Sequence, residues 1–274
     1  ETDTGSPEPI IESCNTVLSP AAQGVCTVNS GTNNALLLEG DLVLPTGILS
    51  GGQVLVSAQG VIACVGCDCD AEAEAAAATR VTCAEGLISP GLINAHDHIS
   101  FTEMKPAKHG DERYDHRHEW RKGLNGKTKL SAFSNKHEKG DSWGEIRQVI
   151  AGTTSLFGSG GEDGFLRNLD KSYLLEGLTQ DAAFYSTFPL GDNDGTLASS
   201  GCSAYDFDNP STASNAVAYV PHVAEGINPE ARNEFVCMTG TEDASEDLLL
   251  HTSAYIHGVG TQTADIGLMA AEGA

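Results

Sequence analysis

The stretch that decides the fold is Leu87-Ile88-Ser89-Pro90-Gly91-Leu92-Ile93-Asn94-Ala95-His96-Asp97-His98. Ser-Pro-Gly ends the preceding element, and the apolar residues after it predict a buried strand of a parallel sheet. The i, i+2 spacing of His96 and His98 directs both imidazoles to one side of an extended backbone. This pair has two interpretations. The two residues are ordinary histidines, or they supply part of a catalytic metal site that takes about three protein ligands.

Two later stretches repeat this pattern of an apolar run that ends in histidine. Residues 216–226 predict a strand that ends near His222, with Glu225 three residues further on, and residues 254–258 predict a strand that ends at His257. The alternation of strands with helices predicts a parallel α/β sheet or a (β/α)8 barrel with its site on one rim. Further strands are expected at 150–157 and 182–188, and helices at 143–149, 165–178, 228–236 and 263–271.

The first third of the chain has a different texture. Residues 1–32 are rich in Ser, Thr, Pro, Asn and Gly, which predicts an extension without chemistry of its own. Residues 33–87 alternate short apolar runs with Gly- and Asp-containing turns, which is typical of a small antiparallel β domain. Residues 88–274 then form the domain that carries the histidines.

Composition narrows the partners of the protein. The chain has 38 acidic and 15 basic residues and a formal net charge of −23. This charge argues against binding to nucleic acid or to an anionic membrane surface, so a cationic or neutral small-molecule substrate fits better. No apolar run approaches the roughly 20 residues of a transmembrane helix. The chain opens with Glu1 rather than Met, so we expect that an N-terminal segment has been removed.

The eight cysteines predict four disulfides in an exported protein, periplasmic or extracellular. Proximity in the chain favours the pairs Cys14–Cys26 and Cys202–Cys237, while the pairing of the other four is not readable. The alternative is a thiolate zinc site, although such sites usually combine two separate C-x2-C pairs. The four unassigned cysteines are Cys64, Cys67, Cys69 and Cys83.

Residues 105–139 form a polar, charge-dense insertion with a second His-x-His pair, His116 and His118. No apolar strand precedes this pair and Arg117 lies between the imidazoles. We therefore expect a solvated surface loop or the rim of the active site rather than a second metal site. The candidates for the mouth of a pocket are Arg113, Tyr114 and Trp120.

The order of these motifs resembles the amidohydrolase superfamily, in particular the branch of cytosine deaminase, triazine hydrolases and imidazolonepropionase. The motifs are Ser-Pro-Gly-Leu-Ile-Asn-Ala before His96-x-His98, Ala151-Gly152-Thr153-Thr154-Ser155, His222-Val223-Ala224-Glu225-Gly226 and His257-Gly258. The resemblance implies a TIM-type barrel, of which this chain holds strands 1–6, and a small β-sandwich domain. It further implies that a second polypeptide supplies strands 7 and 8 and an Asp ligand, because few residues follow His257.

The resemblance also implies the roles of the site residues. His96, His98 and His222 would bind one divalent transition metal, most readily zinc, with iron as an alternative. His257 would contact the activated water or the substrate, and Glu225 would be the acid/base, unless it is a carboxylate that favours a helix start. Some members hold two metals with a lysine, but Lys171 lies in a predicted helix, which favours one metal.

The predicted function is metal-dependent hydrolysis of a C–N bond, other than a peptide bond, in a cyclic amide, amidine or related small molecule. A water activated by the metal would attack the electrophilic carbon. Two alternatives remain open at the level of sequence. One is a binuclear peptidase or lactonase of the same superfamily, and the other is a catalytically inactive exported binding protein.

Overall fold

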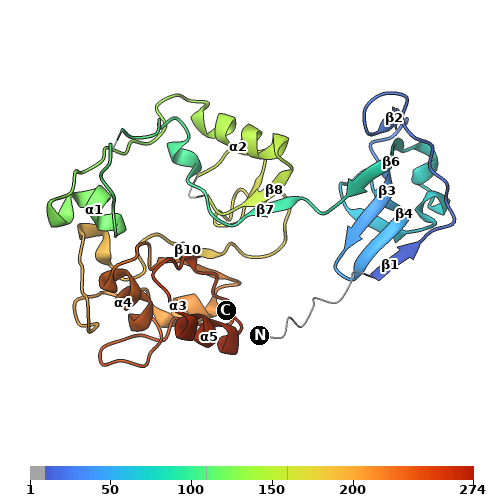
Figure 1. Ribbon diagram of the computed structural model, residues 1–274. Helices are drawn as coiled ribbons and strands as arrows, with labels where there is room; N and C mark the ends of the chain where they lie inside the picture. The colour runs from blue at the N-terminus through green and yellow to red at the C-terminus, as the bar shows by residue number, and fades with distance from the viewer. Residues whose placement is uncertain (1–9, 109, 159) are drawn as a thin grey trace. The chain divides into compact units, whose positions relative to one another are not determined.

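A computed structural model describes residues 10–108, 110–158 and 160–274 and divides the chain into two units, Glu1–Pro90 and Gly91–Ala274 (Figure 1). The division falls three residues after the boundary expected between 87 and 88. The chain is a mixed α/β protein with three sheets, and no closed barrel forms among the described residues.

The first unit contains one six-stranded sheet in the order β1-β4-β3-β6-β2, with β5 paired to β4. The sheet is mixed, because β1 pairs with β4 and β3 with β6 in parallel, so the expected antiparallel β-sandwich is wrong. Antiparallel β3 and β4 coincide with the apolar runs of the sequence, and buried Leu37 and Leu55 fill the core beneath them. The strands are β1 (Ile10–Ser13), β2 (Thr27–Asn29), β3 (Leu36–Leu44), β4 (Gly47–Val56), β5 (Ile62–Gly66) and β6 (Thr79–Ile88).

The structure differs from the expectation of a separate extension over residues 1–32. β1 pairs with β4 and β2 pairs with β6, so the described part of this segment belongs to the sheet of the first unit. Residues 1–9 lie outside the described residues. The polar composition of the segment fits edge strands, because edge strands need no apolar face on both sides.

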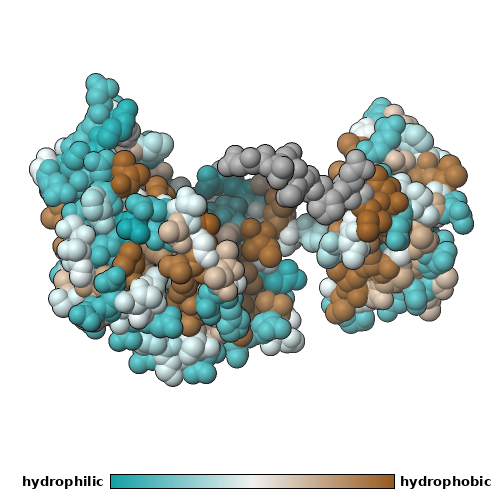
Figure 2. Space-filling view, turned by 60° about the horizontal axis from the view of Figure 1, so that its bottom comes forward, coloured by the Kyte–Doolittle hydropathy of each residue, from teal (hydrophilic) through white to brown (hydrophobic). Residues whose placement is uncertain are grey.

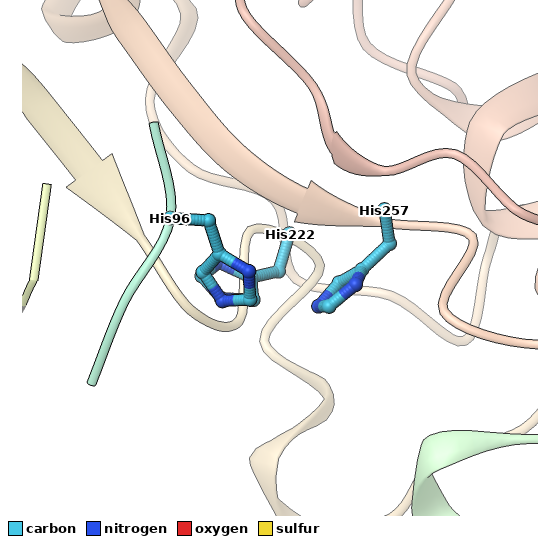
Figure 3. A group of neighbouring side chains, drawn as sticks. All are labelled: His96, His222 and His257. Carbon is cyan, nitrogen blue, oxygen red and sulfur yellow. The ribbon is translucent and has the colours of Figure 1, made fainter. Parts of the chain in front are cut away.

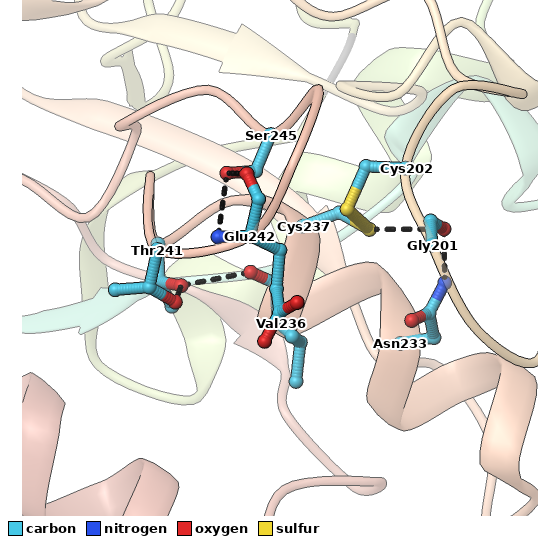
Figure 4. Close-up of a disulfide and its surroundings, with 9 residues drawn as sticks. Gly201, Cys202, Asn233, Val236, Cys237, Thr241, Glu242 and Ser245 are labelled. Carbon is cyan, nitrogen blue, oxygen red and sulfur yellow. Dashed lines mark hydrogen bonds between the residues drawn. A yellow bond between two sulfur atoms is a disulfide. The ribbon is translucent and has the colours of Figure 1, made fainter.

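The disulfides tie the same strands together. The predicted pair Cys14–Cys26 is wrong, because β1 delivers Cys14 to Cys67 while β2 delivers Cys26 to Cys83 on the neighbouring segment. All eight cysteines are paired, which excludes the thiolate zinc site. Cys64–Cys69 completes the first unit, and Cys202–Cys237 forms in the second unit as predicted (Figure 4).

The second unit has six parallel strands divided between two sheets, β7-β8-β9 and β10-β11-β12. The Ala183 N–H donates to Leu169 C=O at 2.8 Å, which links the sheets without continuous pairing of β9 and β10. The strands are β7 (Leu92–Asn94), β8 (Thr153–Leu156), β9 (Arg167–Asn168), β10 (Phe184–Ser186), β11 (Tyr219–Val223) and β12 (Ile256–His257). The helices are α1 (Arg117–Lys122), α2 (Gly140–Ile150), α3 (Pro210–Asn215), α4 (Pro229–Cys237) and α5 (Thr263–Glu272).

The helix expected over residues 165–178 is absent from the structure. Leu166 packs with Ile99 and Leu156, and it leads directly into the short strand β9. The chain then turns repeatedly, and Glu176 and Gly177 adopt left-handed φ values of 48° and 81°. The apolar spacing was therefore a product of turns that bury leucines one at a time, not of a helix face.

A second core lies around β11 and α4 and contains Tyr219, Val223, Phe235 and Met238.

Figure 2 shows apolar residues interspersed with hydrophilic ones on the surface of the chain. None of the described helices combines the length and the apolar character needed to cross a membrane.

Candidate metal centre

The loop after β7 presents His96 and His98. Asn94 Oδ1 accepts the His96 N–H at 3.2 Å, and Asp97 Oδ1 accepts the His98 N–H at 2.7 Å. The Asp97 N–H donates to Phe157 C=O at 2.8 Å, which fastens the loop to the end of β8. These bonds fix the direction in which both imidazoles leave the backbone.

Three imidazole nitrogens converge at the ends of the strands. His96 Nε2 lies 3.1 Å from His98 Nε2 and 3.2 Å from His222 Nε2. Two nitrogens about 2.0–2.1 Å from one tetrahedral metal would be about 3.3 Å apart, so each of these two separations from His96 fits a shared ion. His98 is not in the set of histidines whose ligand atoms all lie within 4.8 Å of one another. Figure 3 shows that the rings of His96, His222 and His257 face one another, and their ligand atoms lie within 4.8 Å.

The hydrogen bond of His222 Nδ1 determines the tautomer of this imidazole and so leaves the lone pair on Nε2. His222 is buried in β11, and its Nδ1–H donates to Ser186 C=O on neighbouring β10 at 3.1 Å. A proton on Nδ1 places a lone pair on Nε2, which faces His96. His222 Nε2 can therefore accept from an N–H of His96, 3.2 Å away, or share a cation with it.

The environment keeps these histidines neutral, as metal ligands must be. Burial and the neighbouring imidazoles lower the pKa of His222 to about 3. Burial, with the neighbouring His96 and Arg117, lowers the pKa of His257 to about 4. Burial likewise lowers the pKa of His96 and of His98.

A carboxylate stands beside the imidazoles. Glu225 Oε2 lies 3.3 Å from His257 Nε2, and burial raises the pKa of Glu225. Ala224 and His257 both have positive φ values, 54° and 76°, which L-residues rarely adopt. Such strain gathers at functional sites, and here the two strained residues flank or form the contact between Glu225 and His257.

A cavity of about 830 Å³ opens onto the histidines. The insertion of residues 105–139 forms much of its wall. Trp120 lines the cavity, whereas Arg113 and Tyr114, the other two residues expected at its mouth, are not part of the lining. The lining residues are His96, His98, Phe101, Met104, Arg117, Trp120, Arg121, Lys122, Lys129, Leu130, Ala132, Phe133, Ser134, Thr187, Phe188, His222, Glu225 and His257.

The expectation of a solvated loop is wrong for the centre of this insertion. His116, Arg117 and His118 are 1%, 2% and 0% exposed. The Arg117 N–H donates to Glu225 C=O at 3.0 Å, and the Ile227 N–H donates to Asp115 C=O at 2.9 Å. The insertion is therefore paired, backbone to backbone, with the loop that carries Glu225.

A buried network of charges holds the insertion in place. His116 Nε2 lies 3.0 Å from Glu234 on α4, and His118 Nε2 lies 2.7 Å from Asp192. The Arg117 guanidinium pairs with Asp192 and donates to Thr187 C=O at 2.9 Å. No local sequence pattern predicts this network, because its two carboxylates, Asp192 and Glu234, are far from the insertion in the sequence.

His116, His118 and Glu234 lie close enough to hold a metal, but their hydrogen bonds argue against it. His116 Nδ1 accepts the His118 N–H at 3.1 Å, so its proton is on Nε2 and points at Glu234. His118 Nδ1 accepts from Arg121 at 2.8 Å, so its Nε2–H points at Asp192. Both imidazoles are donors toward carboxylates, which leaves no lone pair for an ion.

Two other residues considered in the sequence lie apart from the centre. His251 is exposed and follows no strand. Lys171 Nζ lies 3.9 Å from Asp170 and is not part of the cavity lining, so it does not supply a bridging ligand there.

The similarity of this chain to known proteins is distant. No protein-family model and no curated protein matches the chain. A triazine hydrolase from Arthobacter aurescens superposes with a TM-score of 0.44 at 14% identity, over 88% of this chain and 64% of the other. A Xaa-Pro dipeptidase superposes with a TM-score of 0.40 at 12% identity, over 87% of this chain and 65% of the other. The chain thus spans about two thirds of each of these structures, and the likeness does not establish its family.

Proposed function

We propose that this protein is a metal-dependent hydrolase that opens a C–N bond, other than a peptide bond, in a cyclic amide, amidine or related small molecule. One observation carries the proposal: His98 Nε2 and His222 Nε2 lie 3.1 Å and 3.2 Å from His96 Nε2, and Glu225 and His257 lie 3.3 Å apart at the same cavity. Zinc suits this set of neutral imidazoles, and iron is the alternative.

A divalent ion held by the three histidines would lower the pKa of a water ligand to about 7 and polarise the bond to be broken. Glu225 has a raised pKa and sits where it can take a proton from the attacking water and deliver it to the leaving nitrogen. His257, 3.3 Å from Glu225, holds that carboxylate in place and faces the developing charge. The Tyr185 hydroxyl lies 3.4 Å from His222 Nε2.

The four disulfides indicate an oxidising compartment. As part of the proposal we place the enzyme in the periplasm or outside the cell. A second polypeptide that completes the barrel and adds an Asp ligand also stays a prediction.

The test is a screen of cyclic amides and amidines against zinc-loaded protein, with release of ammonia or opening of the ring as the readout. We expect turnover by the intact chain and none by His96→Ala. Turnover that persists in His96→Ala would refute the proposal, as would the failure of every compound with protein that holds a full complement of zinc. Cleavage confined to dipeptides or lactones would favour the binuclear alternative instead.

A further inference from the structure

The cavity at the candidate metal centre is lined by more basic than acidic residues, although the chain as a whole is acidic. Four cationic residues line it, Arg117, Arg121, Lys122 and Lys129, while Glu225 is the single acid among the described lining residues. Over the whole sequence, acidic residues outnumber basic ones 38 to 15. Cations are thus concentrated where a substrate would bind, in a protein that otherwise repels anions.

Within the described part of the chain, three of these four cations make no direct ion pair, although Asp192 and Glu225 act on Arg121, and Asp194 on Lys122, at longer range. Arg117 pairs with Asp192, but the described residues form no ion pair with Arg121, Lys122 or Lys129. Arg121 donates instead to neutral acceptors, His118 Nδ1 at 2.8 Å and Asn193 Oδ1 at 2.8 Å. Burial and the charge of Arg117 lower the pKa of Arg121 against the opposing effect of Asp192 and Glu225, so a further anion beside Arg121 would favour its charged form.

The buried network orients the Arg121 side chain in the cavity. His118 is held by Asp192, and Arg121 is held by His118, three residues earlier on α1. The Arg121 guanidinium also lies over the Phe188 ring, 4.2 Å from its centroid. A guanidinium that is oriented in advance loses little entropy when it binds a carboxylate through two hydrogen bonds.

Apolar and aromatic side chains form the rest of the wall. Phe101, Trp120, Phe133 and Phe188 line the cavity together with Leu130. Such a wall suits an apolar or aromatic portion of a ligand, while the cations orient its charged end.

We infer that the substrate of this site carries a carboxylate, which Arg121 binds with help from Lys122 and Lys129, and an aromatic or apolar portion that packs on Phe188 and Trp120. This inference rests on the proposed function and names the substrate class of the same site. It replaces the cationic or neutral substrate suggested by the net charge, because the local charge of the cavity, not the total, meets the ligand.

The test is equilibrium binding to the full chain after removal of metal with a chelator, so that hydrolysis and carboxylate–metal contacts play no part. The probes are matched pairs: benzoate and benzamide, phenylacetate and phenylacetamide, and N-benzoylglycine and N-benzoylglycinamide. At least one acid should bind about tenfold more tightly than its amide, and this preference should fall between about 20 mM and about 500 mM salt, where screening is strong.

Variants separate the roles of the cations. Arg121→Gln should reduce binding of the preferred acid about tenfold and leave the amide unchanged, while Arg121→Lys should restore part of the preference. The pair Lys122→Gln with Lys129→Gln should act in the same direction, and these two exposed residues make no hydrogen bond through their ammonium groups among the described residues. Arg147→Gln, an exposed change on α2 outside the cavity, is the matched control and should have no effect. Thermal melting confirms that each variant is folded.

Equal binding of every acid and its amide would overturn the inference, as would the absence of measurable binding by all three acids or a preference that survives the cavity variants. Metal content measured on the same preparations keeps the two proposals apart. Protein that prefers acids but binds no metal retains the anion site and contradicts the hydrolase, and the reverse result contradicts the anion site alone.

Discussion

Glu225 connects the metal centre to proton transfer, and its replacement tests that role. Glu225→Gln keeps the size of the side chain but removes the group that takes up a proton, so kcat should fall by about 10²–10⁴-fold. Metal content should stay unchanged, because Glu225 does not belong to the group of histidines that could hold the ion. Metal analysis beside the rate measurement checks this, and full activity in Glu225→Gln would reduce the residue to a structural carboxylate.

The histidines predict how the stability of metal-free protein depends on pH. His222 and His257 have pKa values of about 3 and about 4 in the folded chain, against 6.5 ordinarily. Between these values the unfolded chain binds more protons than the folded chain, so folded stability falls as the pH is lowered through this range. Thermal melting from about pH 7.5 to about pH 4.5 should show a steeper loss for wild type than for the double variant His222→Gln, His257→Gln. Equal slopes would contradict the assigned environment.

At the scale of single residues, the sequence predicted that His96, His222 and His257 lie together, which the structure shows, but it did not predict their surroundings. Histidines at the ends of apolar runs were readable, because strands of a parallel sheet end at one edge. His116, Arg117 and His118 were not, because charge density predicts exposure and the partners Asp192 and Glu234 are distant in sequence. Burial of such residues depends on pairing, which a local pattern does not reveal.

At the scale of elements, the contact between the insertion and the loop after β11 depends on Gly226. A Cβ there would lie 2.4 Å from Asp115 O and 2.9 Å from His116 Cα, both backbone atoms. Gly226→Ala should therefore push the insertion away, lower the free energy of unfolding by about 1–3 kcal/mol and reduce activity.

Gly267→Ala is the control for this change. Gly267 is exposed on α5, and a Cβ added there meets nothing within 4 Å. Alanine in a helix interior is about 0.5–1 kcal/mol more favourable than glycine, so this variant should be slightly more stable. Urea unfolding of both variants decides the matter, and similar curves would mean that the insertion is not held by the Gly226 contact.

Most of the predicted strands formed, whereas one predicted helix did not. Strands β8, β10, β11 and β12 fell within the predicted apolar stretches, but only β11 is buried along its whole length. The buried strand expected before His96 is wrong in this respect, because Leu92 and Ile93 of β7 are 59% and 64% exposed. The helix expected over residues 165–178 did not form, because tertiary contacts of Leu166 reproduced a helical spacing in a chain of turns.

For the whole molecule, disulfides dominate the first unit, which contains three of the four. A native disulfide contributes about 2–5 kcal/mol, so reductant should lower the melting temperature of the chain markedly. The double variant Cys26→Ser, Cys83→Ser should lose stability of this order without losing bound metal, because the histidines belong to the other unit.

Mass mapping of the intact disulfides checks the same prediction directly. It should find Cys14 bonded to Cys67 and Cys26 bonded to Cys83, with no titratable thiol. Proximity along the chain misled the prediction of Cys14–Cys26, because sheet pairing, not loop length, brings these cysteines to their partners. Four or more free thiols would contradict the connectivity described here.

The central claim is that His96, His98 and His222 hold one metal ion, and metal analysis of the intact protein tests it most directly. Protein purified without chelator, then dialysed and measured by plasma mass spectrometry, should contain about one equivalent of a divalent transition metal, as expected for a mononuclear site. His96→Ala and His222→Ala should each remove it, while His116→Gln should retain it. Less than about half an equivalent in the wild type after zinc loading, or metal that persists without His96 and His222, would contradict the account.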